Sequence, residues 1–202
     1  MAGTAESKQL AAIAAIRAAN ASCRTVFYLN SQIDFPELAL HAEFVAANGT
    51  WWLRDDEGGY VLHRPNEHVI DWTVPAAREA WLDTAAKALA EGSVDGIFVD
   101  KASNGQSFHG VRRGRMRAWN EGHDTLLASL RKSTAKLVLL NNAHAAPAAP
   151  GGAGMGQLFE RWGNPIDHDK LDLVDDMKLL GELQTDGLVF ISKNHEFSLV
   201  FC

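Results

Sequence analysis

The sequence predicts an α/β fold, with a single domain over residues 1–202 built around a mainly parallel sheet. Segments with strand character alternate with segments with helix character along most of the chain, which is typical of βαβ units. Two predicted strands contain the continuous apolar runs "GIFV" and "LVLL", as expected where helices cover both faces of a sheet. The length of 202 residues is enough for one sizeable core.

The elements of the first half are marked by apolar stripes and by end signals. Leu10, Ile13 and Ile16 form one stripe of a helix over residues 5–20. Thr73 is the candidate N-cap of the helix predicted from residue 74, which has Pro75 near its start. We predict helices over 5–20, 36–46 and 74–92, strands over 25–30, 68–72 and 94–100, and a hairpin at "DDEGG", residues 55–59.

The second half continues the alternation. A helix is predicted over 115–133, with Gly122 as a weak point, and a buried strand over 136–142. A loop rich in Pro, Gly and Ala follows. We predict a strand or helical turn at 157–163, a helix over 167–184 and strands at 186–193 and 196–202.

Charge and composition narrow the classes of partner. The net charge of −6 does not indicate a nucleic-acid partner. Four arginines form a local basic patch, which we interpret as a solvated face: Arg112, Arg113, Arg115 and Arg117. Two cysteines, Cys23 and Cys202, are too few for a disulfide scaffold, and their spacing matches no zinc module; whether they form a single bridge is left open. We expect no metal, cofactor or membrane partner and no secretory signal in this chain; the compartment and the oligomeric state are left open.

Polar residues recur where predicted strands end. The apolar runs end at Asn30, Asp71, Asp100, Asn141 with Asn142, and Glu160. Any one of them could be a helix N-cap. The carboxyl ends of parallel strands lie at one edge of a sheet, where such folds carry their sites. Together these residues favour a polar cleft lined by carboxylates and amides.

The motifs that the sequence lacks and the carboxylates that it contains indicate the chemistry of this cleft. The sequence has no dinucleotide fingerprint, P-loop, HExxH or G-x-S-x-G motif. Asp100 and Glu160 are the best pair of carboxylates, with Asp71 in reserve, and such pairs hydrolyse glycosidic bonds. The expected contacts to a carbohydrate substrate come from amides, one further carboxylate and aromatic rings: Asn30, Trp52, Asp71, Trp72, Asn104 and Asn141.

Several segments resemble a known family. "VFYLNSQIDFP", "WWLRDDEGG", "VIDWTVPAAREAWLDTAAKAL", "VDGIFVDKASN" and "LLNN" look like hypothetical glycoside hydrolases of the TIM-barrel class, related to endo-polygalactosaminidases. The resemblance implies a (β/α)₈-type barrel in which Asn30, Asp71, Asp100 and Glu160 end strands two, three, four and six. Only six or seven strands can be recognised, so we expect an incomplete or minimal barrel.

Three functions follow as hypotheses. The first is a glycosidase in which Asp100 is nucleophile or base and Glu160 is general acid/base. The second is a carbohydrate-binding barrel without catalysis, or an inactive truncated remnant. The third is a metal-dependent hydrolase with Asp71, Asp100 and Glu160 as oxygen ligands.

Two aspartates of one strand are expected to differ in role. Asp100 leaves the strand at its carboxyl end, whereas Asp95 precedes Gly96 at the amino end. In barrels the amino end contributes stability rather than catalysis. We therefore expect Asp100 to be needed for chemistry and Asp95 to form a local turn.

Overall fold

The computed structural model describes residues 4–103 and 105–141 with their side chains, and the backbone of the strands at 155–160, 188–192 and 200–201. The helices are α1 (Ala5–Ala19), α2 (Ala39–Ala46), α3 (Pro75–Ala90) and α4 (Arg113–Ser133). The strands are β1 (Arg24–Asn30), β2 (Ile33–Asp34), β3 (Leu62–Arg64), β4 (Glu67–Val69), β5 (Gly96–Asp100), β6 (Leu137–Asn141), β7 (Met155–Glu160), β8 (Leu188–Ser192) and β9 (Val200–Phe201). The predicted helix over 167–184 lies outside the described residues.

Six strands form the main sheet, in the order β8-β7-β6-β5-β1-β9. The neighbouring strands from β1 to β8 are all parallel, and β9 is antiparallel to β1. The prediction of an α/β fold with a mainly parallel sheet is therefore confirmed. Over the strands that the structure describes, the sheet is open, with β8 and β9 at its two edges.

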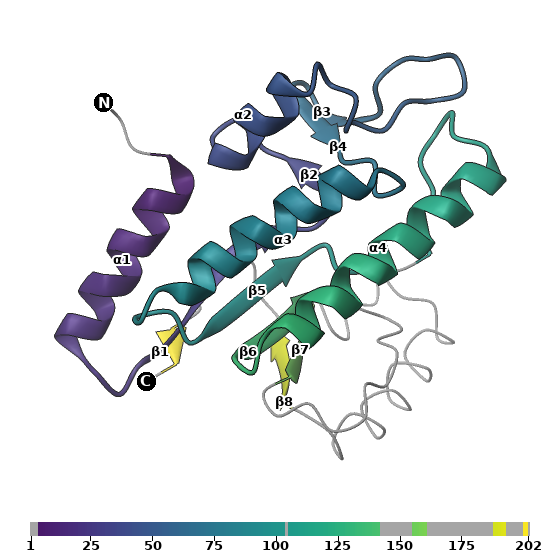
Figure 1. Ribbon diagram of the computed structural model, residues 1–202. Coiled ribbons are helices and arrows are strands. Elements are labelled where there is room, and N and C mark those ends of the chain that lie inside the picture. Colours follow the sequence, from purple (N-terminus) through teal and green to yellow (C-terminus); the bar gives the residue numbers. More distant parts are fainter. Residues whose placement is uncertain (1–3, 104, 142–154, 161–187, 193–199, 202) are drawn as a thin grey trace.

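The two faces of this sheet carry different residues. α3 and α4 lie across one face, and α1 packs beside β1 (Figure 1). Alternate strand residues such as Phe27, Ile97 and Leu140 belong to the large core under these helices. The residues between them, such as Phe98 and Leu139, form a separate small cluster. Since side chains alternate along a strand, this second cluster marks the face opposite the helices, called the inner face below.

A second, antiparallel sheet corrects the predicted strand at 68–72. β4 pairs with β2 and β3 in a small three-stranded sheet, and β1 pairs directly with β5. Asp71 therefore does not end a strand of the main sheet, and no third strand lies between Asn30 and Asp100. The hairpin at 55–59 is confirmed by the Arg54–Tyr60 bridge and by the hydrogen bond from Asp55 N to Gly59 O, 2.8 Å.

Gly122 is a point of close packing rather than a weak point of its helix. α4 runs unbroken through it, and a Cβ added there would lie 2.2 Å from the carbonyl oxygen of Trp72. Glycine thus lets α4 approach the segment that leads into α3. None of the described helices is long and apolar enough to cross a membrane.

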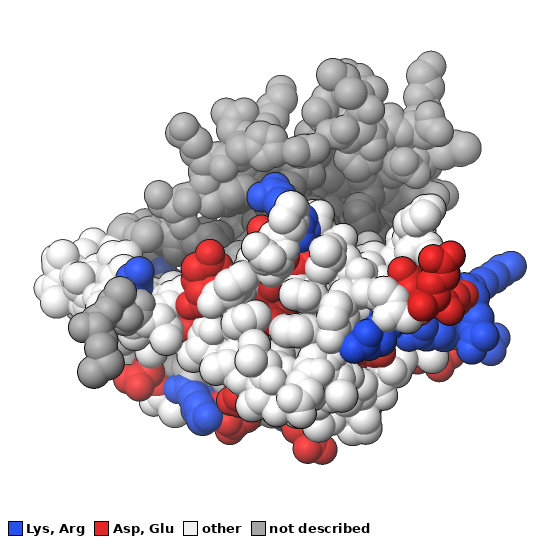
Figure 2. All heavy atoms as spheres, turned by 90° about the horizontal axis from the view of Figure 1, so that it is seen from above, with Lys and Arg blue, Asp and Glu red and all other residues white. Residues whose placement is uncertain are grey.

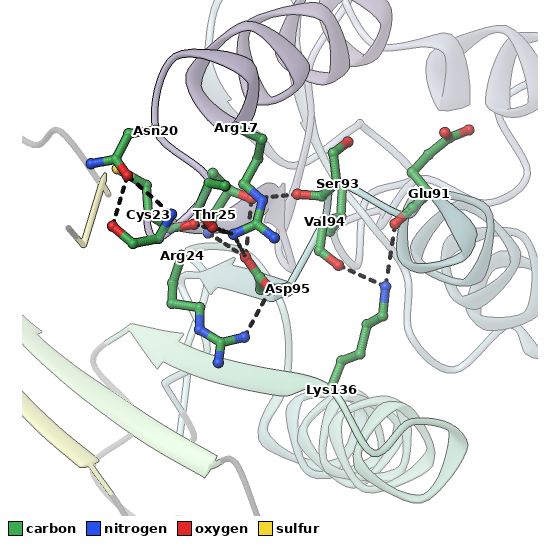
Figure 3. A network of polar contacts seen from close by, with 12 residues as sticks. Arg17, Asn20, Cys23, Arg24, Thr25, Glu91, Ser93, Val94, Asp95 and Lys136 are labelled. Carbon is green, nitrogen blue, oxygen red and sulfur yellow. Dashed lines mark hydrogen bonds and ion pairs between the residues drawn. The ribbon is translucent and has the colours of Figure 1, made fainter.

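The amino end of the sheet is held by Asp95. Its carboxylate accepts hydrogen bonds from Thr25 N at 2.9 Å and from Arg24 at 3.1 Å, and it lies 3.6 Å from Arg17 (Figure 3). Burial alone would raise the pKa of Asp95, but the Thr25 amide and the two guanidinium groups outweigh burial and lower the pKa. The prediction that Asp95 forms a local turn is wrong. Its carboxylate instead connects β5 to β1 and to the end of α1.

Lys136 closes the same end of the sheet. Its Nζ donates to the carbonyl oxygens of Leu89 at 2.7 Å, Glu91 at 3.2 Å and Val94 at 2.6 Å. These carbonyls belong to the last turn of α3 and the loop after it, where helices leave acceptors unsatisfied. Just before β1, Cys23 is buried and disulfide-bonded.

The arginine patch lies at the start of α4. Arg115 is 3.6 Å from Asp56, and Asp56 also accepts the backbone N–H of Arg112 at 3.1 Å. Figure 2 shows basic and acidic side chains side by side at the right-hand edge of the molecule, where this helix begins. Pairing within the chain agrees with the interpretation of the patch as a solvated face.

Candidate active site

Three neighbouring strands end in polar side chains on the inner face. The register pairs Asn30 of β1 with Asp100 of β5, and Val99 with Leu140 of β6, so Asn141 follows beside Asp100. Tyr28 lies two residues before Asn30 and therefore shares its face. The sheet register alone thus gathers one carboxylate, two amides and one phenol at the carboxyl ends of β1, β5 and β6.

Asp100 is the centre of this group. Its Oδ2 accepts hydrogen bonds from Tyr28 Oη at 2.9 Å and Asn30 Nδ2 at 3.2 Å. Its Oδ1 accepts from Asn141 Nδ2 at 2.8 Å and from the backbone N–H of Lys101 at 2.7 Å. Four donors from three strand ends fix both oxygens of one carboxylate, and such directed donors hold an anionic group in a single orientation.

Asn30 has a second set of bonds that fixes its own amide. Its Oδ1 accepts from the backbone N–H groups of Gln32 and Ile33, each at 2.9 Å, where the chain turns from β1 into β2. The Nδ2 group is thereby directed toward Asp100. Asn30 and Asn141 are almost completely buried, so in this structure both amides orient the carboxylate.

The backbone leaves β5 in an unusual conformation. Lys101 has a φ of 52°, in the left-handed region that few residues other than glycine adopt. The peptide between Asp100 and Lys101 directs the Lys101 N–H to Asp100 Oδ1, and the left-handed Lys101 then turns the chain away from the direction of the strand. This peptide thus supplies the fourth donor to the carboxylate.

Two residues expected at the site have other positions. Asp71 accepts hydrogen bonds from Thr73 N at 3.0 Å and Thr73 Oγ1 at 2.7 Å, in the turn that leads into α3. Trp72, expected to contact the substrate, has its side chain fully buried in this structure. Its Nε1 donates instead to the carbonyl of Ser31 at 2.7 Å. Its size and its ring N–H are used for packing beneath the strand ends.

Trp52 belongs to a cluster around a buried carboxyl group. Its Nε1 donates to Asp34 Oδ2 at 2.8 Å, and the same oxygen lies 2.7 Å from His41 Nδ1. The indole ring stacks on His68 with 3.9 Å between ring centroids. Burial raises the pKa of Asp34 against the lowering effect of its bonds to His41 and Trp52. Trp52 is thus held at its polar edge and on one ring face.

Two expected site residues fall outside the described side chains. Glu160 is the last residue of β7, and its backbone is paired with Ser192. Leu158, two residues earlier, is paired with Asn141 of β6. Asn104 lies outside the described residues.

Tyr28 and the Asp34–His41 pair were missed in the sequence. Tyr28 could have been found, because alternation along "VFYLN" places it on the face of Asn30. Asp34 and His41 have no such signal, since they are joined by the packing of β2 against α2 and not by spacing.

Comparison with known protein families identifies the family of this chain. A profile of the family described as "Hypothetical glycosyl hydrolase family 15" matches residues 17–198. The chain belongs to this glycosyl hydrolase family. The matched residues include β1, β5, β6 and β7 and the whole polar group around Asp100. The prediction of a glycoside hydrolase is confirmed at the level of the family, and the family implies a carbohydrate substrate.

Solved structures of other glycoside hydrolases match the chain at low sequence identity. The glycoside hydrolase domain of PelA from Pseudomonas aeruginosa, solved as a variant, matches with a TM-score of 0.54 and 20% identity, over 84% of this chain and 67% of that chain. A maltogenic α-amylase from Thermotoga neapolitana matches with a TM-score of 0.49 and 13% identity, over 79% of this chain and 35% of that chain. At these identities the PelA domain shows the fold alone. No curated protein matches the chain.

Proposed function

We propose that this member of the glycosyl hydrolase family hydrolyses O-glycosyl bonds, with Asp100 as nucleophile and Glu160 as general acid/base. The single observation that carries the proposal is the set of four donors around Asp100. Retaining glycosidases need one carboxylate that attacks the anomeric carbon and one carboxylic acid that protonates the leaving oxygen. Their different tasks require different surroundings.

The surroundings of Asp100 suit the nucleophile. Every hydrogen bond described for its carboxylate comes from a donor: a phenol, two amides and a backbone N–H. Such a carboxylate has a fixed direction of attack and no proton placed for donation. An acid that protonates a leaving group needs the opposite, a site that favours the neutral form.

The sheet register supports Glu160 as the partner. β7 is two strands from β5, and adjacent strands lie about 4.8 Å apart. Position 160 lies two residues beyond position 158, the partner of Asn141, and therefore has the same parity in the register. Retention needs the two carboxyl groups about 5–5.5 Å apart, so the proposal requires the side chains of Asp100 and Glu160 to converge across β6.

We place this site in a (β/α)₈-type barrel that is incomplete or minimal. The parallel β1-β5-β6-β7-β8 order with helices outside supports a barrel, as does the PelA match. In such barrels the catalytic groups lie at the carboxyl ends of strands. The inner face, with Tyr28, Asn30, Asp100 and Asn141, is then the wall of the substrate cleft.

The metal-dependent hydrolase is less well supported. Asp71, one of its three proposed ligands, has its carboxylate engaged by Thr73. Among the side chains that the structure describes, no three His, Cys, Asp or Glu groups are arranged to hold a metal ion.

The test is a panel of polysaccharides and aryl glycosides with wild-type protein, Asp100→Asn, Glu160→Gln and the control Asp95→Asn. For a substrate that wild type cleaves, Asp100→Asn should lower kcat by about three orders of magnitude or more. Asp95→Asn should cleave at nearly the wild-type rate. The anomeric proton of the first sugar released, followed by NMR, should show retained configuration. Full activity of Asp100→Asn contradicts the proposal, and binding without cleavage favours a carbohydrate-binding barrel.

A further inference from the structure

Beneath Asp100 lies a buried hydroxyl–imidazole pair that the proposed reaction does not use. Ser31 and His123 are both completely buried, and His123 Nε2 lies 2.9 Å from Ser31 Oγ. Ser31 comes directly after β1, whereas His123 is in the middle of α4. Burial excludes a role as a nucleophile and base toward an external substrate.

The hydroxyl of Ser31 lies within hydrogen-bonding distance of two consecutive backbone carbonyls, those of Asp100 and Lys101. Ser31 Oγ lies 2.9 Å from the carbonyl oxygen of Asp100 and 3.0 Å from that of Lys101. Ser31 N also donates to the Asp100 carbonyl at 3.0 Å. Gln32 Nε2 adds a bond to the Lys101 carbonyl at 2.8 Å. The carbonyls on either side of the left-handed residue are therefore held from the end of β1.

The direction of the His123 bond follows from these contacts. Ser31 Oγ has a single hydrogen, and the two carbonyl oxygens within its reach can only accept. With the hydroxyl hydrogen on a carbonyl, the imidazole donates from Nε2 to Ser31 Oγ, so these contacts favour the tautomer that carries its proton on Nε2. Within the described part of the chain His123 Nδ1 is buried and has no partner, as the lone-pair nitrogen of that tautomer would be.

Two tryptophan rings lie against the imidazole of His123. Its ring stacks between Trp119, at 5.2 Å between centroids, and Trp72, at 6.3 Å. Trp72 Nε1 donates to the carbonyl of Ser31 itself. Ser31 thus receives donors from α4 and from the segment before α3, while it donates to the turn after β5.

We propose that Ser31 and His123 are positioning residues for Asp100. Ser31 donates to the Asp100 carbonyl, which lies in the same peptide plane as the Lys101 N–H, and so keeps this N–H on Asp100 Oδ1, while His123 holds the Ser31 hydroxyl. The inference rests on the proposed function for its link to catalysis, and on the hydrogen bonds alone for the positioning. Neither residue touches the substrate.

Hydrogen exchange of the Lys101 amide, followed by NMR, tests the positioning without any substrate. In Ser31→Ala, protection of this amide should fall roughly tenfold, about the effect of one lost hydrogen bond. His123→Leu should have the same effect. His123→Gln, which keeps a donor near the position of Nε2, should restore much of the protection.

The matched control is Thr25→Val. Thr25 Oγ1 is also a buried hydroxyl on the β1 segment that donates to a carbonyl, that of Ser93 at 2.5 Å, but at the amino end of the sheet. This variant should leave the Lys101 amide unchanged. If Ser31→Ala also leaves it unchanged, the proposal is wrong, and the small size of this substitution guards against failure to fold.

Kinetics separate this inference from the proposed function. On a substrate that wild type cleaves, Ser31→Ala should lower kcat about tenfold with KM nearly unchanged. An unchanged kcat despite lost protection overturns the catalytic part of the inference. If wild type cleaves nothing while the exchange effect is present, the hydrolase proposal fails and the positioning of Asp100 stands.

Discussion

Tyr28 Oη donates a hydrogen bond to Asp100 Oδ2 across the β1–β5 pair, at 2.9 Å. The bond joins two side chains 72 positions apart, and the same carboxylate oxygen also accepts from Asn30. This oxygen therefore has two donors from a single neighbouring strand.

We predict that Tyr28→Phe reduces catalysis more than stability. The substitution keeps the ring, which packs near Phe98, and removes the hydroxyl that orients Asp100. The expected loss in kcat is about tenfold, the effect of one hydrogen bond to a charged group. Steady-state kinetics and thermal unfolding measure the two effects. Tyr60→Phe is the control, because Tyr60 Oη is bonded to Arg54 near the surface, and an equal loss in both variants would contradict the prediction.

The stability of the protein should fall in mild acid because of His123. Burial lowers the pKa of this imidazole from 6.5 to about 4. Between these pH values the unfolded chain binds the proton and the folded chain does not, so stability increases with pH over this range. The loss between pH 7 and pH 4 should be on the order of 3 kcal/mol for this group.

Urea unfolding of wild type and His123→Gln at several pH values isolates this effect. Asp34 contributes with the opposite sign, because burial raises its pKa, but this contribution is shared by both proteins. The difference in unfolding free energy between wild type and variant should shrink as the pH falls from 6.5 toward 4. A difference independent of pH would mean that His123 does not titrate in this range.

Asp95→Asn should reduce stability and leave catalysis intact. The variant weakens the bonds to Thr25 and Arg24 and the attraction of Arg17. We expect a loss of about 1–3 kcal/mol, which thermal unfolding would register as a lower Tm. Asp83→Asn is the control, since the Asp83–Lys87 pair is exposed and solvent screens such pairs. Equal Tm values for the two variants would show that the amino-end contacts do not stabilise the sheet.

Two glycines of α4 should respond in opposite directions to alanine. Gly122→Ala places a methyl group against the carbonyl of Trp72, which cannot move without shifting the backbone, and should cost about 1–3 kcal/mol. Gly114 is in the first turn and has open space around it. Gly114→Ala should be neutral or should stabilise by up to about 1 kcal/mol through helix propensity. Urea unfolding of both variants decides the point, and a stabilising Gly122→Ala would contradict the packing described for this helix.

The parts of the fold that follow local rules could be predicted from the sequence. β5 and β6 are continuous apolar runs, and their order between helices predicts parallel pairing. Asp100 was placed correctly at the carboxyl end of β5, because the change from apolar to polar residues marks where a strand ends. Its role in catalysis stays a prediction.

The rest depended on pairings that local sequence does not encode. "HVID" has the composition of a strand, but whether it joins β1 or the short segment after β1 is decided by contacts far along the chain. That pairing removed Asp71 from the main sheet. The bonds of Asn30 and Asn141 to Asp100 likewise depend on register, so the sequence could indicate amides at the strand ends and not their partner.

The contacts of Asp95 and Lys136 have a consequence for laboratory evolution. They tie the helix ends and the strand starts together at the amino side of the sheet, away from the carboxyl side that holds Asp100. Substitutions in the segments after β1 and β5 would not change these hydrogen bonds of Asp95 and Lys136. Libraries that vary such segments, with the amino side kept constant, should therefore retain a large fraction of folded variants in which to select new substrate preferences.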